Sequence, residues 1–356
     1  MCGILLINIP LMAGPVGMER PMAAPSLADP DWQVWTIAQL FVFGTMRGLF
    51  SMLFGIGLLL FFEGSGKSDG LYLRRLAMLF LFGVANGTVL LWPGDILTTY
   101  AIAGIAVLAF RDRSPHRLLV AGLVAIGLMS VLMTIEIGLM PADQFLYSPE
   151  TLATEAAARH GSYADNLAYL SHVTAKWTLD IASILWIAES AGFMLVGMAL
   201  WRGDWMEGAR PRMLIAGYAI GLPLRIAQAI AIFGNDGNPT GWTAMVDQVA
   251  RLGMTLGHAG LVLTLWPHAR NAFAPLARMG RMALTLYLGQ SALAAVIFSG
   301  FGLGLWGRLN GWGEWGVAAL ILVAEALFAT FWFTRFRYGP MEWLWRWGTY
   351  GRRPTG

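Results

Sequence analysis

The stretch LAMLFLFGVANGTVLLWPGDILTTYAIAGIAVL, residues 76–108, contains a single charged residue, Asp95. Apolar runs lie on both sides of the corner Trp92-Pro93-Gly94-Asp95, and each is close to the roughly 20 residues that a helix needs to cross a bilayer. Proline and glycine at the corner interrupt a helix. The stretch therefore predicts two helices that cross a membrane in opposite directions.

The rest of the 356-residue chain has the same character, since it is 57% hydrophobic and 13% charged. A typical globular domain is about 25% charged. The apolar runs are continuous, which excludes the alternating pattern of an outer-membrane β-barrel. We expect an all-α polytopic integral membrane protein with about ten transmembrane helices in one bundle, and residues 1–356 form a single domain. The expected spans are residues 2–18, 36–62, 72–92, 95–110, 117–140, 177–201, 212–233, 242–266, 281–305 and 315–334.

The connectors between these spans alternate in charge along the chain. By the positive-inside rule, connectors rich in Lys and Arg face the cytoplasm, and the acidic connectors face the opposite side. Because the number of expected spans is even, both termini are expected on the cytoplasmic side. The positive connectors contain Lys67, Arg74 and Arg75; Arg111, Arg113 and Arg117; Arg202, Arg210 and Arg212; and Arg270, Arg278 and Arg281.

Two segments lie outside the expected spans. Residues 141–176 form an acidic extracytoplasmic loop around an Ala-rich stretch, and we expect either a helix lying over the bundle or a solvated connector. Residues 335–356 combine Trp with Arg and predict a cytoplasmic amphipathic tail that anchors to membrane lipids. The basic residues lie beside helices, where orientation explains them, so we expect no nucleic-acid partner.

Ionisable groups inside the spans are candidates for function, because each costs about 2.5–3.5 kcal/mol at the centre of a membrane helix. Arg47 has no acid in its own span, so its partner is expected from another helix or from an anionic ligand. Arg225 and Gln228 share a helix face, and Asp247 and Arg251 share a face of the next helix, so the four could also form a structural polar knot. The residues expected to bind substrate are Arg47, Glu189, Arg225 and Gln228.

His258 is a further candidate, because it lies near the middle of its expected span. With an ordinary pKa of about 6.5 it could act as a general base or relay a proton, or it could be a hydrogen-bonded structural residue. Metal ligation is not expected, since the chain has no HExxH or CxxC motif and only one cysteine, Cys2.

Three motifs in the sequence suggest a family. The segments RRLAMLFLFGVANGTVLLWPGDILTTYAIAGIAVL (74–108), GRMALTLYLGQS (280–291) and GPMEWLWRWGTYG (339–351) resemble the YeiB-like bacterial inner-membrane proteins, whose C-terminal half is a domain of unknown function. The resemblance implies a location in the bacterial cytoplasmic (inner) membrane and a distant similarity to transmembrane acyltransferases. Family members commonly have His at the place of Asn86 and carry an Asp-x-Leu-Arg-Gly stretch ahead of the segment that resembles MCGILLINI.

The similarity to acyltransferases implies transfer of an acyl group from a cytoplasmic donor such as acyl-CoA to an extracytoplasmic, glycan or lipid-linked acceptor. The expected catalytic residues are Asn86, Asp95 and His258. Arg47 would hold an anionic or carbonyl group, and Asn86 would donate to the oxyanion. Asp95 would take the acceptor proton, although capping of the following helix also explains it. His258 would be the fallback base.

Two other functions are compatible with the sequence. A small-molecule or proton-coupled transporter would line its pathway with Arg47, Glu189, Arg225 and Glu325, and His258 would relay protons. Broken helices and an internal repeat would favour it, and the sequence shows neither. A non-catalytic membrane scaffold would use its polar residues only to hold helices together. The sequence specifies neither a substrate nor an oligomeric state.

Overall fold

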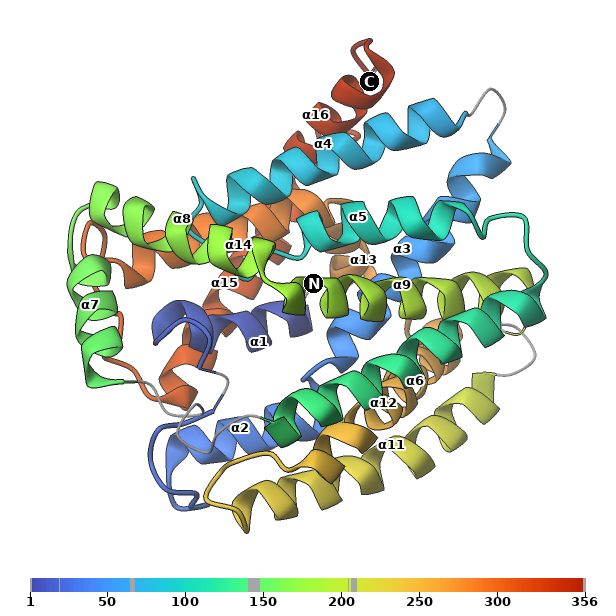
Figure 1. Ribbon diagram of the computed structural model, residues 1–356. Helices are drawn as coiled ribbons and strands as arrows, with labels where there is room; N and C mark the ends of the chain where they lie inside the picture. Colours follow the sequence, from blue (N-terminus) through green and yellow to red (C-terminus); the bar gives the residue numbers. More distant parts are fainter. Residues whose placement is uncertain are drawn as a thin grey trace.

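The protein is helical throughout the part of the chain that the structure describes. The computed structural model describes residues 2–18, 20–64, 68–139, 148–203, 205 and 210–354, and these residues include no β-strand (Figure 1). Lys67, residues 140–147 of the expected loop and the last two residues of the tail lie outside the described residues. The helices are α1 (Cys2–Ala13), α2 (Pro30–Phe41), α3 (Thr45–Glu63), α4 (Asp69–Gly87), α5 (Leu97–Leu108), α6 (Pro115–Leu139), α7 (Pro149–His160), α8 (Tyr163–Leu179), α9 (Ile181–Arg202), α11 (Arg210–Phe233), α12 (Gly241–Ala269), α13 (Ala274–Arg281), α14 (Ala283–Phe298), α15 (Gly311–Trp332) and α16 (Pro340–Tyr350).

These helices have the length and composition of a polytopic membrane protein. Among the described residues, six helices are long and apolar enough to cross a membrane, and the bent pair α13 and α14 gives a seventh. Two expected spans correspond to shorter apolar helices, α1 and α5. The remaining expected span, residues 72–92, corresponds to α4, which has 19 residues and carries Arg74 and Arg75 near its start. The all-α polytopic fold is therefore confirmed.

The expected span 36–62 corresponds to the apolar region Pro30–Glu63, which begins six residues earlier than expected and is interrupted by a turn between α2 and α3. Asp29 caps α2, which ends at Phe41, and α3 begins only at Thr45. Gly44 lies between them with φ +67°, a backbone conformation that favours glycine. The break exposes the Phe43 carbonyl, which accepts a hydrogen bond from Arg225 at 2.8 Å. The irregular backbone is thus stabilised by another helix.

The expected span 281–305 also differs from the structure. Its first residue belongs to α13, which meets α14 at an angle of 86°, and α14 ends at Phe298. The start of α14 is capped from far along the chain, because the Glu342 carboxylate accepts hydrogen bonds from the backbone N–H groups of Leu284 and Thr285 at 2.7 and 3.1 Å. The tail helix α16, which carries Glu342, thereby packs against the bundle beside α4 (Figure 1).

The segment expected as an extracytoplasmic loop contains α7 and α8, which pack on the bundle. Ser148 and Ser162 cap the two helices. Glu155 accepts a hydrogen bond from the Val16 backbone at 2.9 Å, and Arg159 donates to the Met12 carbonyl. Both side chains are buried, and burial raises the pKa of the Glu155 carboxyl. These residues therefore form two helices packed on the bundle and not a solvated connector.

The close pair α11 and α12 positions much of the candidate site (Figure 1). Glycines line the contact, and a Cβ at Gly217, Gly221 or Gly253 would collide with the backbone of the opposite helix. Small residues at such a contact allow membrane helices to approach closely. The hairpin brings Arg225 of α11 and Asp247 of α12 together. The sequence predicted that the polar residues of these two helices could form a polar knot.

Candidate functional site

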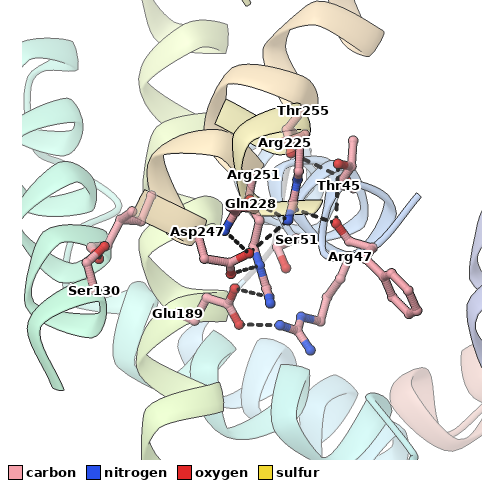
Figure 2. A network of polar contacts seen from close by, with 12 residues as sticks. Thr45, Arg47, Ser51, Ser130, Glu189, Arg225, Gln228, Asp247, Arg251 and Thr255 are labelled. Carbon is pink, nitrogen blue, oxygen red and sulfur yellow. Dashed lines mark hydrogen bonds and ion pairs between the residues drawn. The ribbon is translucent and has the colours of Figure 1, made fainter. Parts of the chain in front are cut away.

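A buried ionic network connects α3, α9, α11 and α12 (Figure 2). Glu189 of α9 is at its centre, and the side chain is 3% exposed. One carboxylate oxygen of Glu189 accepts from Arg47 at 2.6 Å, and the other accepts from Arg251 at 3.0 Å. Arg251 also pairs with Asp247 one turn earlier on α12. Two carboxylates therefore connect guanidinium groups from different helices.

Arg225 forms the second half of the network. Its guanidinium donates to Asp247 at 2.8 Å and to the Phe43 carbonyl at the α2–α3 break. Gln228 donates to the Thr243 carbonyl at 2.8 Å and to Asp247 at 3.3 Å. The Arg225 side chain is only 1% exposed, so these partners replace water around a buried cation.

Among the described residues, the ion pairs of this network join three arginines to two carboxylates. Arg47 is the most exposed of its members at 24%, compared with 17% for Arg251 and 1% for Arg225. The Arg47 guanidinium also lies 4.1 Å from the centre of the Trp186 ring. Arg47 is therefore the member best placed to receive an anionic group, which its planar fork of donors suits.

A second polar centre surrounds Asp95, between α4 and α5. Asn86 donates to one carboxylate oxygen of Asp95 at 2.9 Å, and the Tyr287 hydroxyl of α14 donates to the same oxygen at 3.3 Å. The other oxygen accepts from the Thr98 backbone at 3.0 Å, which caps α5. This carboxylate has neutral donors around it and no cation in ion-pair contact among the described residues.

Asn86 is fully buried in this centre. Its side-chain nitrogen already donates to Asp95, so the expected oxyanion role would compete with that hydrogen bond. Its side-chain oxygen is buried and has no hydrogen-bond partner among the described residues. An unpaired buried acceptor is costly, and a donor from a ligand would satisfy it.

Helix α5 connects the two centres. Asp95 lies two residues before α5, and Tyr100 lies in its first turns. The Tyr100 hydroxyl donates to the Arg47 backbone carbonyl at 3.1 Å and accepts from Ser51 at 3.0 Å. Helix α5, which begins two residues after Asp95, therefore contacts α3 at the Arg47 backbone.

His258 is placed apart from both centres. Its Nδ1 atom lies 2.8 Å from the carbonyl of Met254 on its own helix, and its ring contacts Tyr218 of α11 at 5.5 Å. Neither contact involves Asn86 or Asp95. The structure thus brings Arg47, Glu189, Arg225 and Gln228 into one network and Asn86 and Asp95 into another, and His258 belongs to neither.

Several residues of these centres were missed at the sequence level. Tyr287, Tyr100 and Trp186 lie in apolar runs, where aromatic residues are ordinary, so the sequence did not mark them as site residues. The only available signal was that Tyr287 lies within the motif GRMALTLYLGQS. Among the described residues, no group of three or more His, Cys, Asp or Glu could hold a metal ion.

Comparisons with known proteins show which proteins the chain is similar to. Residues 197–352 match the family described as "Protein of unknown function (DUF418)". The chain is 28% identical to the uncharacterized protein YeiB of Escherichia coli (strain K12) over 374 residues, covering 97% of this chain and 92% of the relative. The chain is therefore similar to YeiB, and its residues 197–352 match the DUF418 model. It is also 27% identical over 381 residues to the uncharacterized protein YxaH of Bacillus subtilis (strain 168), covering 98% of this chain and 91% of the relative. No solved structure matches it.

Both polar centres join the DUF418 region to the half of the chain that precedes it. Arg225, Asp247 and Tyr287 lie inside the matched region, whereas Glu189 and Asp95 lie before it. This chain therefore assembles its polar centres from the DUF418 region and from the half that precedes it.

Proposed function

We propose that the protein is a transmembrane acyltransferase of the bacterial inner membrane, with both termini in the cytoplasm. It would move an acyl group from a cytoplasmic acyl donor such as acyl-CoA to an extracytoplasmic, glycan or lipid-linked acceptor. The observation that supports this proposal is the buried carboxylate of Asp95 just before α5, a helix whose Tyr100 hydroxyl donates to the backbone carbonyl of Arg47 in the arginine-rich network.

The proposed reaction uses Asp95 as the general base. The acceptor hydroxyl would donate its one proton to Asp95, and a second donor group of the acceptor would bond to the unpaired Asn86 oxygen. As the acceptor oxygen bonds to the thioester carbonyl carbon, its proton passes to Asp95, the carbon–sulfur bond breaks, and the thiolate leaves and takes up a proton. A positioned base contributes about 10²- to 10⁴-fold to such a step.

Arg47 would hold an anionic or carbonyl group of the donor. Its guanidinium is partly exposed and already oriented by Glu189 and the Trp186 ring, so little reorganisation is needed on binding. Arg225, Gln228 and Glu189 would keep this arginine and the broken α2–α3 backbone in place. His258 has no part in this proposal.

Donor binding tests the role of Arg47. Purified protein in detergent is titrated with labelled acetyl-CoA and with a longer acyl-CoA, and Arg47→Ala is compared with Arg117→Ala, an exposed arginine of α6 outside the network. We expect binding or slow hydrolysis that Arg47→Ala weakens at least tenfold and Arg117→Ala leaves unchanged. Failure of every acyl-CoA to bind the folded protein would reject the acyltransferase.

A small-molecule or proton-coupled transporter is the second candidate, and the helix breaks favour it. The Pro30–Glu63 region is interrupted at Gly44, and an ionic network lies beside the exposed Phe43 carbonyl. Transporters use such interrupted helices at their binding sites. If the protein is a proton-coupled transporter, we expect a proton-coupled flux in proteoliposomes. Glu189→Gln and His258→Ala should each reduce this flux. A flux that survives both changes would remove the proposed relay.

A further inference from the structure

The C-terminal segment of the protein has an unbalanced positive charge. Residues 335–353 contain five arginines and one acidic residue, Glu342. Both oxygens of the Glu342 carboxylate are occupied, because Leu284 and Thr285 donate to them at the start of α14. None of the ion pairs found among the described residues includes an arginine of this segment. The acid nearest in sequence therefore does not neutralise these arginines.

An aromatic groove lies between the end of α15 and the start of α16. It has a volume of 330 Å³. The Trp332 and Phe336 rings stack at its floor with their centres 4.3 Å apart, and the Phe336 side chain is 51% exposed. Trp343 of α16 forms the opposite wall. Apolar rings that stay open to the surroundings in this way form a surface for an apolar ligand group.

Two guanidinium groups lie against one ring at the edge of this groove. Arg337 is 5.4 Å and Arg346 is 4.5 Å from the centre of the Tyr338 ring. Tyr338 is itself a lining residue of the groove, and so is Arg337. Two cations beside one lining ring make this edge of the groove positive and attract an anion. Arginine forks bind phosphate with good geometry.

We propose that this groove is a binding site for one anionic phospholipid. The headgroup phosphate lies between Arg337 and Arg346, and an acyl chain lies along Trp332, Phe336 and Trp343. The apolar floor favours a lipid over a free phosphate ion, which would need polar groups on all sides. The positive-inside rule predicts the cytoplasmic side for this segment, where anionic lipids are attracted by arginine.

The site has a structural consequence for α16. Trp345 donates to the Arg75 carbonyl of α4 at 2.9 Å, and Glu342 caps α14, so α16 contacts two other helices. A lipid that bridges α15 and α16 adds a contact present only when α16 is docked. Binding to the folded state raises the unfolding temperature. This inference is independent of the proposed acyltransferase.

Native mass spectrometry of the full chain in detergent tests the site. Phosphatidylglycerol is titrated, with phosphatidylcholine and glycerol phosphate as separate arms. We expect one tightly bound phosphatidylglycerol, which 100-fold glycerol phosphate does not displace. The double variant Arg337→Gln/Arg346→Gln should bind it at least about tenfold more weakly. The matched control Arg113→Gln/Arg212→Gln removes two exposed arginines from connectors predicted on the same side and should bind as the unchanged protein does.

Phe336→Ala provides a second variant that keeps every charge. Because its ring is half exposed, the protein is expected to fold, and phosphatidylglycerol should bind at least fivefold more weakly without this part of the floor. Equal weakening in the two double variants would overturn the proposal, because general charge attraction would then explain binding. Equal affinity for phosphatidylcholine, or unchanged binding in Phe336→Ala, would also overturn it.

Discussion

The two polar centres of this protein stabilise buried carboxylates in different ways. In the ionic network, Glu189 and Asp247 are each paired with two arginines, and their charges are compensated. Around Asp95 the described residues supply neutral donors, from Asn86, Thr98 and Tyr287. Compensated charges resist proton transfer, whereas a carboxylate held by neutral groups can accept a proton at lower cost. Under the proposed function, the first centre serves structure and anion binding and the second serves the chemistry.

The largest effect is expected from breaking the ionic network at its most buried member. Arg225→Ala leaves Asp247 with one arginine and leaves the Phe43 carbonyl without its side-chain donor. Removing one partner of a buried ion pair costs about 3–5 kcal/mol. Chemical unfolding in detergent measures this, with Arg212→Ala on the exposed end of α11 as control. A loss below about 1 kcal/mol would mean that the network is not structural.

A smaller effect is expected at the broken helix, where the network meets the backbone. Gly44→Ala places a Cβ on residue 44 at φ +67° and against the side chain of Arg251. We expect a loss of about 1–3 kcal/mol in the free energy of unfolding. Gly57, whose added Cβ meets nothing within 4 Å, supplies the control Gly57→Ala. Equal stability of the two variants would show that the break is not under constraint.

The Asp95 centre is expected to tolerate the loss of one neutral donor. Tyr287→Phe removes the hydroxyl that donates to Asp95 and accepts from the Ile96 backbone. Because Asn86 and Thr98 still donate to Asp95, we expect a loss of about 1–2 kcal/mol, less than for Arg225→Ala. The same unfolding assay measures both variants. If Tyr287→Phe lost more free energy of unfolding than Arg225→Ala, the contrast between the two centres would be contradicted.

The smallest effect concerns Asp165, an exposed carboxylate that serves as a reference for both centres. Hydrogen bonds from the Ser162 hydroxyl and backbone lower the pKa of Asp165. A lowered folded-state pKa adds stability above the unfolded pKa of about 3.9, and this is lost as the pH falls through the folded value. Asp165→Asn should therefore lower the unfolding temperature slightly at pH 7, and the difference should shrink as the pH falls below about 3.9. A difference that does not shrink in acid would contradict this origin.

The parts predictable from the sequence are those that local patterns determine. Continuous apolar runs predicted the helices. The spacing of Arg225 with Gln228 and of Asp247 with Arg251 predicted the polar pairs on α11 and α12. The pairing of Arg47 with Glu189 joins residues 142 positions apart, which no local spacing reveals.

The breaks in the helices were also not predicted from the sequence, because they too depend on residues far apart along the chain. The α2–α3 break depends on Arg225 from another helix, and the bend before α14 is capped by Glu342 from the tail. Both interruptions lie in runs whose composition favours continuous helices. Tertiary contacts therefore decide where these helices end, although hydropathy decides that they exist.

The most direct test of the account is acyl transfer by the Asp95→Asn variant. Protein in proteoliposomes with a fixed orientation is given labelled acetyl-CoA on the cytoplasmic side and a panel of hydroxyl-bearing glycan and lipid acceptors on the other side. We predict that the unchanged protein labels an acceptor and that Asp95→Asn, which keeps the size of the side chain, lowers the rate at least about 100-fold. His258→Ala should retain the rate. Full activity of Asp95→Asn would contradict the central claim.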